Sequence, residues 1–279
     1  MNRHTELTSL LRGLKLVAMA ECVSDVALTA ARANLSHEAF LYELVRVEQE
    51  QRTQRRVERL RRESGLPREK TFATLELASF SPLIRQQVER LRRGEFVKEA
   101  VNVVAVGPPG VGKSHLLASL GEVLVAQGVP VLWSSTAPLM QRLLAAKRDL
   151  RLPQELARLD RYACLILDDI GYVQHDQDEM EVLFTLLSER YERRSVMLST
   201  NLVFSEWTRI FKHPLTTVAA IDRVVHHSVI LDLMGMASFR AQAARAAQQA
   251  GAKAEEEGAA ASAEEEARDW LETVQAPSV

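Results

Sequence analysis

The chain has 279 residues, of which 47% are hydrophobic, 26% charged and 5% aromatic; this composition is ordinary for a globular protein of one domain with attachments or two small domains. The formal net charge is −2, but residues 241–279 contain three basic and eight acidic side chains, so the first 240 residues are mildly basic. This balance excludes a wholly basic nucleic-acid-binding surface and confines any such contact to a local patch.

Targeting and redox features indicate a cytoplasmic protein with no membrane contact. The first residues, MNRHTELTSLL, lack the apolar core of a secretory signal, and the longest uncharged run, residues 123–141, is interrupted by glycine and prolines. Cys22 and Cys164 lie far apart in the sequence, which argues against a disulfide framework or a zinc site. We expect Cys164, in the apolar run YACLIL, to be a core residue.

Residues 1–68 are predicted to form a small, all-helical N-terminal domain. Ser36 is a suitable N-cap, and Gly65 and Pro67 are suitable terminators, for one helix of roughly 28 residues. The first half of this helix has an apolar face, with Phe40 and Leu44 among its members. The second half, EQEQRTQRRVERLRRESG, has few apolar positions and is expected to project beyond the packed part.

A row of arginines follows the second half of the same helix. They recur at i, i+3, i+7 and i+10 and therefore share one face: Arg52, Arg55, Arg59 and Arg62. Such a row can neutralise the phosphates of double-stranded DNA without reading its sequence. The alternative is a solvated helix with Glu48–Arg52 and Glu58–Arg62 ion pairs. The sequence leaves both interpretations open.

From residue 69 to residue 240 the pattern changes to strands alternating with helices. Short β-branched runs occupy residues 101–106, 129–134, 163–167, 195–199 and 228–233, with helical patterns between them, for example at 113–127 and 178–194. This alternation predicts an α/β domain with a parallel sheet covered on both faces. Residues 241–279 are rich in Ala and Glu and are expected to be disordered or to form a frayed helix.

The first strand of this domain is followed directly by a phosphate-binding motif. It satisfies G-x-x-x-x-G-K-[ST] and consists of Gly107, Pro108, Pro109, Gly110, Val111, Gly112, Lys113 and Ser114, with His115 next. A strand before it and a helix after it are the context that the motif requires. The loop N–H groups are predicted to bind the triphosphate of ATP at the positive end of the helix, Lys113 to reach the β- and γ-phosphates, and Ser114 to ligate Mg²⁺.

Polar residues follow two later strands. The run CLIL ends in Asp168 and Asp169; Asp168 is predicted to hold Mg²⁺ and Asp169 to orient or deprotonate the attacking water. Asn201 follows the next strand, at the edge where open α/β sheets bind ligands. It could hydrogen-bond this water or the γ-phosphate, although a turn-forming asparagine is an equally good interpretation of this residue alone.

The stretch AAIDRVVHHS, residues 219–228, raises the question of a metal site. His226 and His227 are adjacent, so on a helix their side chains would point roughly 100° apart and would not easily share a metal. They are interpreted as histidines at a helix end, near the negative end of its dipole. Arg223 by itself is an ordinary helix arginine, paired with Asp222.

The motifs together resemble a known group of proteins. GPPGVGKSHLLASLG, LILDDIGY, LSTNLVFSEW, AIDRVV and GMASFR, in this order, resemble the IstB/DnaC-type branch of the AAA+ ATPases. The N-terminal segments LRGLKLVAMAE and LSHEAFLYELVRVEQEQR resemble IstB-like insertion-sequence transposition helpers more than replicative helicase loaders. The resemblance implies a AAA+ fold with a five-stranded sheet and a reduced C-terminal lid, ATP-dependent homo-oligomers on DNA, and a cognate transposase as partner.

The resemblance also implies catalytic roles for three residues. Asn201 matches the first sensor of these ATPases, Arg223 the arginine finger that acts in trans on a neighbouring subunit, and Arg240 the second sensor. Together with Asp169 they complete the predicted catalytic set.

These patterns predict an ATPase that assembles on DNA in its ATP-bound state and assists a transposase in DNA transposition. A replicative helicase loader with the same core is one alternative. A nucleotide-dependent interaction scaffold with little turnover is another, because many similar ATPases have Glu where Asp169 stands. An ATPase assay with and without DNA separates the scaffold from the other two.

Overall fold

The computed structural model describes residues 3–170, 177–207, 214–239 and 241. Arg240 and, apart from Ala241, the predicted tail lie outside the described residues. Within these ranges no helix combines the length and apolar character that crossing a lipid bilayer requires.

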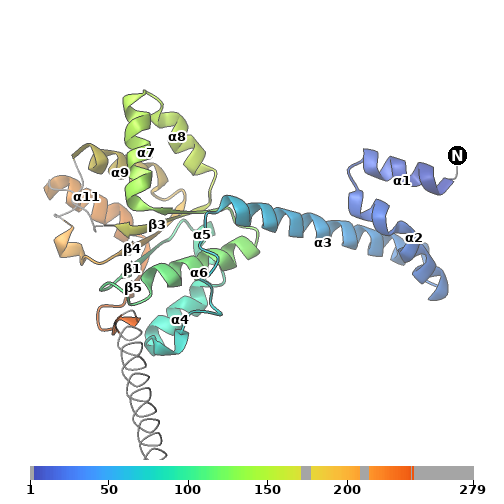
Figure 1. Cartoon of the computed structure of the whole chain (residues 1–279), viewed down its shortest axis with the longest axis horizontal. Helices are drawn as coiled ribbons and strands as arrows, with labels where there is room; N and C mark the ends of the chain where they lie inside the picture. The colour runs from blue at the N-terminus through green and yellow to red at the C-terminus, as the bar shows by residue number, and fades with distance from the viewer. Residues whose placement is uncertain (1–2, 171–176, 208–213, 240, 242–279) are drawn as a thin grey trace, which may run out of the picture.

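A parallel five-stranded sheet forms the centre of the larger part of the molecule (Figure 1). Its strands are β1 (Asn102–Val106), β2 (Val131–Ser135), β3 (Cys164–Ile170), β4 (Ser195–Thr200) and β5 (Ser228–Asp232), in the spatial order β2-β3-β4-β1-β5. Every residue of β1 and β4 is buried, as expected for strands covered on both faces. The prediction of a parallel α/β sheet is confirmed.

Helices cover both faces of this sheet. One face packs against α6 (Lys113–Ala126), α4 (Pro82–Leu91), the short α5 (Glu95–Lys98) and the end of α3 (His37–Glu63). The other packs against α7 (Thr136–Arg148), α8 (Leu152–Asp160), α9 (Gln177–Arg190) and α11 (Pro214–Val225). Two short 3₁₀ turns, η1 (Leu77–Ser79) and η2 (Phe204–Glu206), lie in the connections. The sheet therefore separates two apolar clusters.

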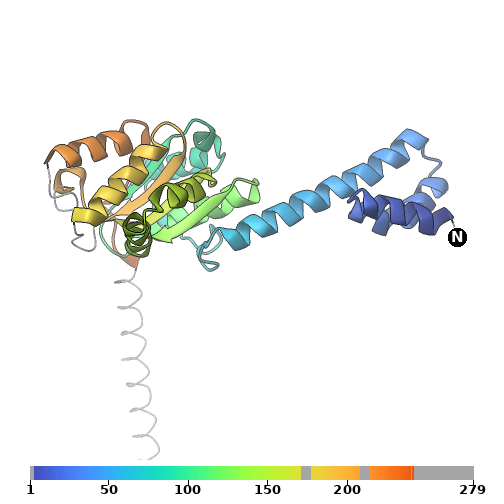
Figure 2. The same cartoon turned by 90° about the horizontal axis from the view of Figure 1, so that it is seen from above.

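The N-terminal helices form a second, smaller packed unit. In both views α1 (Arg3–Gly13) and α2 (Val17–Arg32) lie beside the first half of α3, far from the sheet (Figures 1 and 2). Met19, Val23 and Leu44 form its small core. Ser36 is the N-cap of α3, since its side chain accepts a hydrogen bond from the backbone N–H of Ala39. The predicted start of this helix is confirmed.

A buried carboxylate joins α2 to α3. Glu48 is 5% exposed; its Oε2 accepts hydrogen bonds from the N–H groups of Ala18 (2.8 Å) and Met19 (3.1 Å), at the start of α2. Its Oε1 accepts one from Arg52 (2.7 Å). Burial acts to raise the pKa of Glu48, but these hydrogen bonds outweigh it and hold the pKa below its usual value. Glu48 thus caps α2 from another helix.

The second half of α3 packs at its end against the sheet-containing part. Leu60 is buried in the cluster on the α6 side. Arg56 donates a hydrogen bond to the carbonyl of Gly128 (3.1 Å), and Arg61 pairs with Glu122 of α6. The prediction that this half projects beyond the packed part holds for residues 49–56, which are exposed, and is wrong for the helix end, where one buried apolar side chain and two arginine contacts seat a largely polar segment.

Two ionisable side chains are buried beside the sheet. Cys164 is fully buried, which raises the pKa of its thiol to about 12 and confirms its place in the core. Burial lowers the pKa of the Arg190 guanidinium to about 10. This guanidinium donates hydrogen bonds to three carbonyl oxygens, those of Leu159, Tyr162 and Ser195, and so fastens α9 to its neighbours.

Candidate active site

The phosphate-binding loop follows β1 and is fixed by its surroundings. Gly107 donates its N–H to the carbonyl of Thr200 (3.2 Å), and a Cβ added at Gly107 would lie 2.9 Å from the Cβ of Leu233. Gly112 is the N-cap of α6 with a φ of +90°, a left-handed conformation that favours glycine. The loop therefore presents its backbone at the positive end of α6.

Lys113 lies inside this loop. Its side chain is buried, and Nζ donates hydrogen bonds to the carbonyl oxygens of Gly107 (2.7 Å) and Pro108 (2.9 Å). These contacts hold the ammonium group at the loop, where the motif predicts the β- and γ-phosphates.

Asp168 links the loop to two strands. Its Oδ1 accepts hydrogen bonds from the hydroxyl of Ser114 at the start of α6 (2.7 Å) and from that of Ser199 on β4 (2.5 Å). Its backbone carbonyl accepts a third from Thr136 (2.8 Å). The structure thus brings together Ser114 and Asp168, the two predicted Mg²⁺ ligands.

A β-bulge follows directly in β3. The pairing register of β3 with β4 shifts between Leu167 and Ile170, and Asp169 has a left-handed φ of +70°. The Asp169 N–H donates a hydrogen bond to the Ser199 hydroxyl (2.8 Å). Bulges re-aim side chains next to active sites, and here Asp169 lines the same cavity as Asp168. No sequence motif predicts this role of Ser199; its one signal is a polar residue at the end of a buried apolar strand.

The cavity beside the loop has a volume of about 500 Å³, within the usual range for small-molecule sites. Among the predicted residues it is lined by Pro109, Gly110, Gly112, Lys113, Ser114, His115, Asp168, Asp169 and Asn201. Among the described residues, the buried Oδ1 of Asn201 has no hydrogen-bond partner. A buried acceptor of this kind needs a donor, which a bound water or ligand would supply.

His115 joins the loop to the segment that precedes β1. Its Nε2 lies 3.0 Å from Oγ1 of Thr74 and 3.1 Å from the carbonyl oxygen of Thr71. The cavity wall on this side includes Lys70, Thr74, Leu75 and Glu76, residues that sequence motifs did not single out. Phe239 closes another side, and its N–H donates to the carbonyl of Gly110 (3.0 Å); Arg240, the next residue, lies outside the described part.

The oxygen atoms of Ser114 and Asp168 beside the cavity suit Mg²⁺ bound together with a nucleotide. Mg²⁺ prefers hard oxygen ligands and is usually held by one or two protein oxygens together with substrate phosphates. The Ser114 hydroxyl and the Asp168 carboxylate, whose oxygens lie 2.7 Å apart, are such ligands. The residues present therefore fit this ion.

Arg223 lies away from the cavity in its own chain. It is half-buried on α11, where its guanidinium carbon is 4.6 Å from the centroid of the Phe184 ring on α9, and Nη1 donates to the carbonyl of Ala219 (3.1 Å). It is absent from the described residues that line the cavity. The structure thus does not bring Arg223 to the other predicted catalytic residues within one chain.

All four arginines of the row on α3 are exposed, but they differ in their contacts: Arg55 donates a hydrogen bond to Gln51 (3.1 Å), and Arg52 makes an ion pair. Arg52 donates to Glu48 and to the carbonyl of Lys15 (2.8 Å), as the ion-pair interpretation expects. In this described helix no ion pair joins Arg62 to its predicted partner Glu58, which instead accepts a hydrogen bond from Gln54.

Comparison with known proteins identifies the family. Residues 9–247 match the family described as IstB-like ATP binding protein. The chain belongs to this family. It is 41% identical over 206 residues to an insertion sequence ATP-binding protein of Sinorhizobium fredii, covering 74% of this chain and 69% of the relative. It is 36% identical over 231 residues to an insertion sequence IS21 ATP-binding protein of Pseudomonas aeruginosa, covering 82% and 87%.

Solved structures show the fold of this IstB-like chain. It resembles a crystal structure of DnaI, with a TM-score of 0.51 and 18% identity over 61% of this chain and 95% of the other. It also resembles AMPPCP-bound DnaA from Aquifex aeolicus, with a TM-score of 0.50 and 16% identity over 61% and 51%. The IstB-like chain has the AAA+ P-loop fold, and the predicted family resemblance, N-terminal helices included, is confirmed.

Proposed function

We propose that this IstB-like protein hydrolyses ATP with Mg²⁺ in the cavity beside the P-loop. The proposal rests on one arrangement of hydrogen bonds. Oδ1 of Asp168 accepts from the Ser114 hydroxyl, at the start of the P-loop helix, and from the Ser199 hydroxyl. Ser199 in turn accepts from the N–H of Asp169, whose side chain lines the same cavity. Family membership supports ATP binding, and this arrangement adds the acidic groups that hydrolysis requires.

Each residue has a distinct task in this mechanism. The loop N–H groups and Lys113 bind the phosphates, and Ser114 and Asp168 hold Mg²⁺, which neutralises phosphate charge when bound. Asp169 orients the attacking water or accepts its proton. Asn201 offers its Oδ1, the buried acceptor, to a hydrogen of the same water.

The position of Arg223 supports an arginine finger that acts between subunits. In its own chain it stacks on Phe184, away from the cavity. A charge supplied by a neighbouring subunit can stabilise the transition state of phosphoryl transfer. The active protein is then a homo-oligomer that closes its interfaces on ATP. The Arg240 role as second sensor belongs to the same proposal.

We further propose that residues 69–240 form the ATPase domain, and that the N-terminal domain, residues 1–68, contacts double-stranded DNA or a cognate transposase. The names of the relatives connect them with insertion sequences, and the family match begins at residue 9, within α1. This match favours transposition over the loading of a replicative helicase. A transposase gene directly beside the gene for this chain would support the partner.

Hydrolysis is tested by one substitution with a matched control. Asp169→Asn removes the proton acceptor and keeps the size of the side chain, so ATP binding should persist while phosphate release falls about a hundredfold or more. Asp232→Asn, at the end of the edge strand β5 and outside this cavity, should hydrolyse ATP at the parent rate. An Asp169→Asn protein with the parent rate would refute the catalytic role, and no hydrolysis by the parent with or without DNA would favour the scaffold.

DNA binding is tested through its salt dependence. The triple variant Arg55→Ala, Arg59→Ala, Arg62→Ala should bind double-stranded DNA more weakly, and the slope of log affinity against log salt should become shallower by about 0.9 for each phosphate that the variant no longer neutralises. Arg46→Ala is the control, because Arg46 lies on the same helix but pairs with Glu43 and Glu50. An unchanged slope in the triple variant would rule out this surface.

A further inference from the structure

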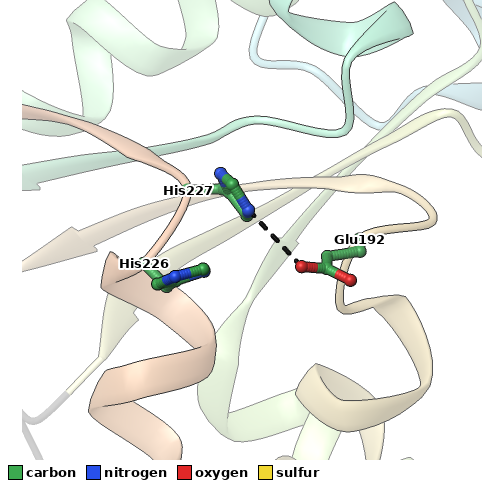
Figure 3. Close-up of side chains that lie close together, drawn as sticks. All are labelled: Glu192, His226 and His227. Atoms are coloured by element: carbon green, nitrogen blue, oxygen red, sulfur yellow. Dashed lines mark ion pairs between the residues drawn. The ribbon is translucent and has the colours of Figure 1, made fainter.

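Two histidines and a glutamate lie close together (Figure 3), at the end of the sheet opposite the ATP cavity. Glu192 lies in the connection between α9 and β4, and His226 and His227 lie in the connection between α11 and β5. Both connections enter the starts of parallel strands, whereas the P-loop follows the end of β1. The cluster is therefore separate from the nucleotide site and does not depend on its proposed chemistry.

The adjacent histidines come near one another at the point where the chain leaves α11: His226 still donates a helical hydrogen bond to Asp222, and the turn begins with it. α11 ends at Val225, and both histidines form the turn that follows. The angle of roughly 100° expected between neighbouring helical side chains does not apply there. One ligand atom from each of Glu192, His226 and His227 lies within 4.8 Å of the other two. The reason for expecting that the two histidines do not easily share a metal therefore does not apply here.

The separation of two of these atoms matches a shared cation. Nε2 of His227 lies 3.4 Å from Oε1 of Glu192. A direct charge-assisted hydrogen bond would bring such atoms to about 2.8 Å. Two ligands bound at about 2.1 Å in a tetrahedral zinc site are about 3.4 Å apart. The observed spacing therefore fits two ligands on one ion, although an ion pair with a protonated His227 has the same spacing.

The surrounding contacts fix the ligands in place. The carbonyl of His227 accepts a hydrogen bond from the N–H of Asn102 (2.7 Å), and the N–H of His226 donates to the carbonyl of Asp222 (2.9 Å). The Tyr191 hydroxyl lies 3.1 Å from Nδ1 of His226, so Nε2 is the nitrogen of that ring outside this contact. Such hydrogen bonds to the second ring nitrogen orient metal-binding histidines.

We propose that Glu192, His226 and His227 form a binding site for a divalent transition-metal ion of the zinc type. Two imidazoles and one carboxylate are a ligand set that Zn²⁺ accepts, with water completing the tetrahedron, whereas Mg²⁺ prefers oxygen ligands. The three side chains are exposed, so the ion enters from solvent. A bound ion joins the connection after α9 to the turn after α11, which begins three residues beyond Arg223.

The test is a calorimetric titration of the metal-free full chain with Zn²⁺. Excess Mg²⁺ is present throughout, so that the oxygen ligands of the nucleotide site bind Mg²⁺ and not Zn²⁺. One Zn²⁺ per chain should bind, and Glu192→Gln and His227→Ala should each weaken binding at least tenfold. Tyr191→Phe should weaken it about tenfold, as loss of a hydrogen bond to a ligand does. His37→Ala, an exposed histidine on α3, is the control and should bind Zn²⁺ like the parent.

Cobalt provides an independent readout. Co²⁺ added to the parent should give the intense visible absorption of a tetrahedral site, and this absorption should be absent from His226→Ala. Absence of stoichiometric Zn²⁺ binding by the parent would overturn the proposal. Equal Zn²⁺ affinity of the parent, Glu192→Gln and His227→Ala would overturn it as well, because the ion would then bind elsewhere.

Discussion

Ser199 connects both acidic residues of the site, and its replacement by alanine tests the geometry of the cavity. Ser199 is 1% exposed; its hydroxyl donates to Asp168 and accepts from the N–H of Asp169. A hydrogen bond to a charged group contributes about 1.5–3 kcal/mol. If the loss of about 2.5 kcal/mol falls on the transition state, the rate falls about 70-fold, because each 1.36 kcal/mol is a factor of ten.

The assay is steady-state ATP hydrolysis by Ser199→Ala, compared with Ser195→Ala. Ser195 is the matched control because it lies on the same strand, is fully buried, and donates one hydrogen bond to the carbonyl of Phe96 (3.3 Å), away from the cavity. Ser199→Thr, which keeps the hydroxyl, should recover much of the rate. Equal rates for Ser199→Ala and Ser195→Ala would refute the idea that Ser199 positions the acidic pair.

Three further predictions concern other parts of the molecule. Arg223→Ala should bind ATP normally but lose hydrolysis, and mixing it with Lys113→Ala subunits should restore part of the activity; no recovery would contradict a finger shared between subunits. Gly107→Ala should cost about 1–3 kcal/mol of unfolding free energy in a denaturant titration, since its Cβ would be 2.9 Å from that of Leu233. Glu48 has a lowered pKa, so its carboxylate contributes stability above its unfolded pKa of about 4.3, and this contribution is lost as pH falls through the folded pKa. In Glu48→Gln the unfolding free energy should therefore fall less steeply with decreasing pH, and amide exchange at the start of α2 should be faster. An unchanged dependence of the unfolding free energy on pH would contradict the role of Glu48 as a cap of α2.

The strands and the main contents of the cavity could be predicted from the sequence because each depends on local pattern. β-branched runs gave the strands, and the carboxyl ends of parallel strands meet at one edge of a sheet. Lys113, Asp168, Asp169 and Asn201 therefore line one cavity, although their motifs are up to 88 residues apart in the chain.

What the sequence did not predict depends on three-dimensional neighbours. The bulge at Asp169 follows from how β3 pairs with β4, and strand alternation carries no sign of it, so the bridging role of Ser199 was missed. The contact of Arg61 with Glu122 joins residues far apart in sequence. The adjacency of His226 and His227 predicts diverging helical side chains, while their third partner, Glu192, comes from a different connection.

The single helix α3 makes the two packed units of the chain mechanically continuous. Its 27 residues span about 40 Å at 1.5 Å per residue. One end bears α1 and α2, and the other is tied through Arg61 to α6, the helix that starts at Lys113 of the P-loop. A tilt of α6 by about 10° would, over that length, displace the far end of α3 by about 7 Å. A rotation of the P-loop helix can in this way become a movement of several ångströms at the N-terminal helices.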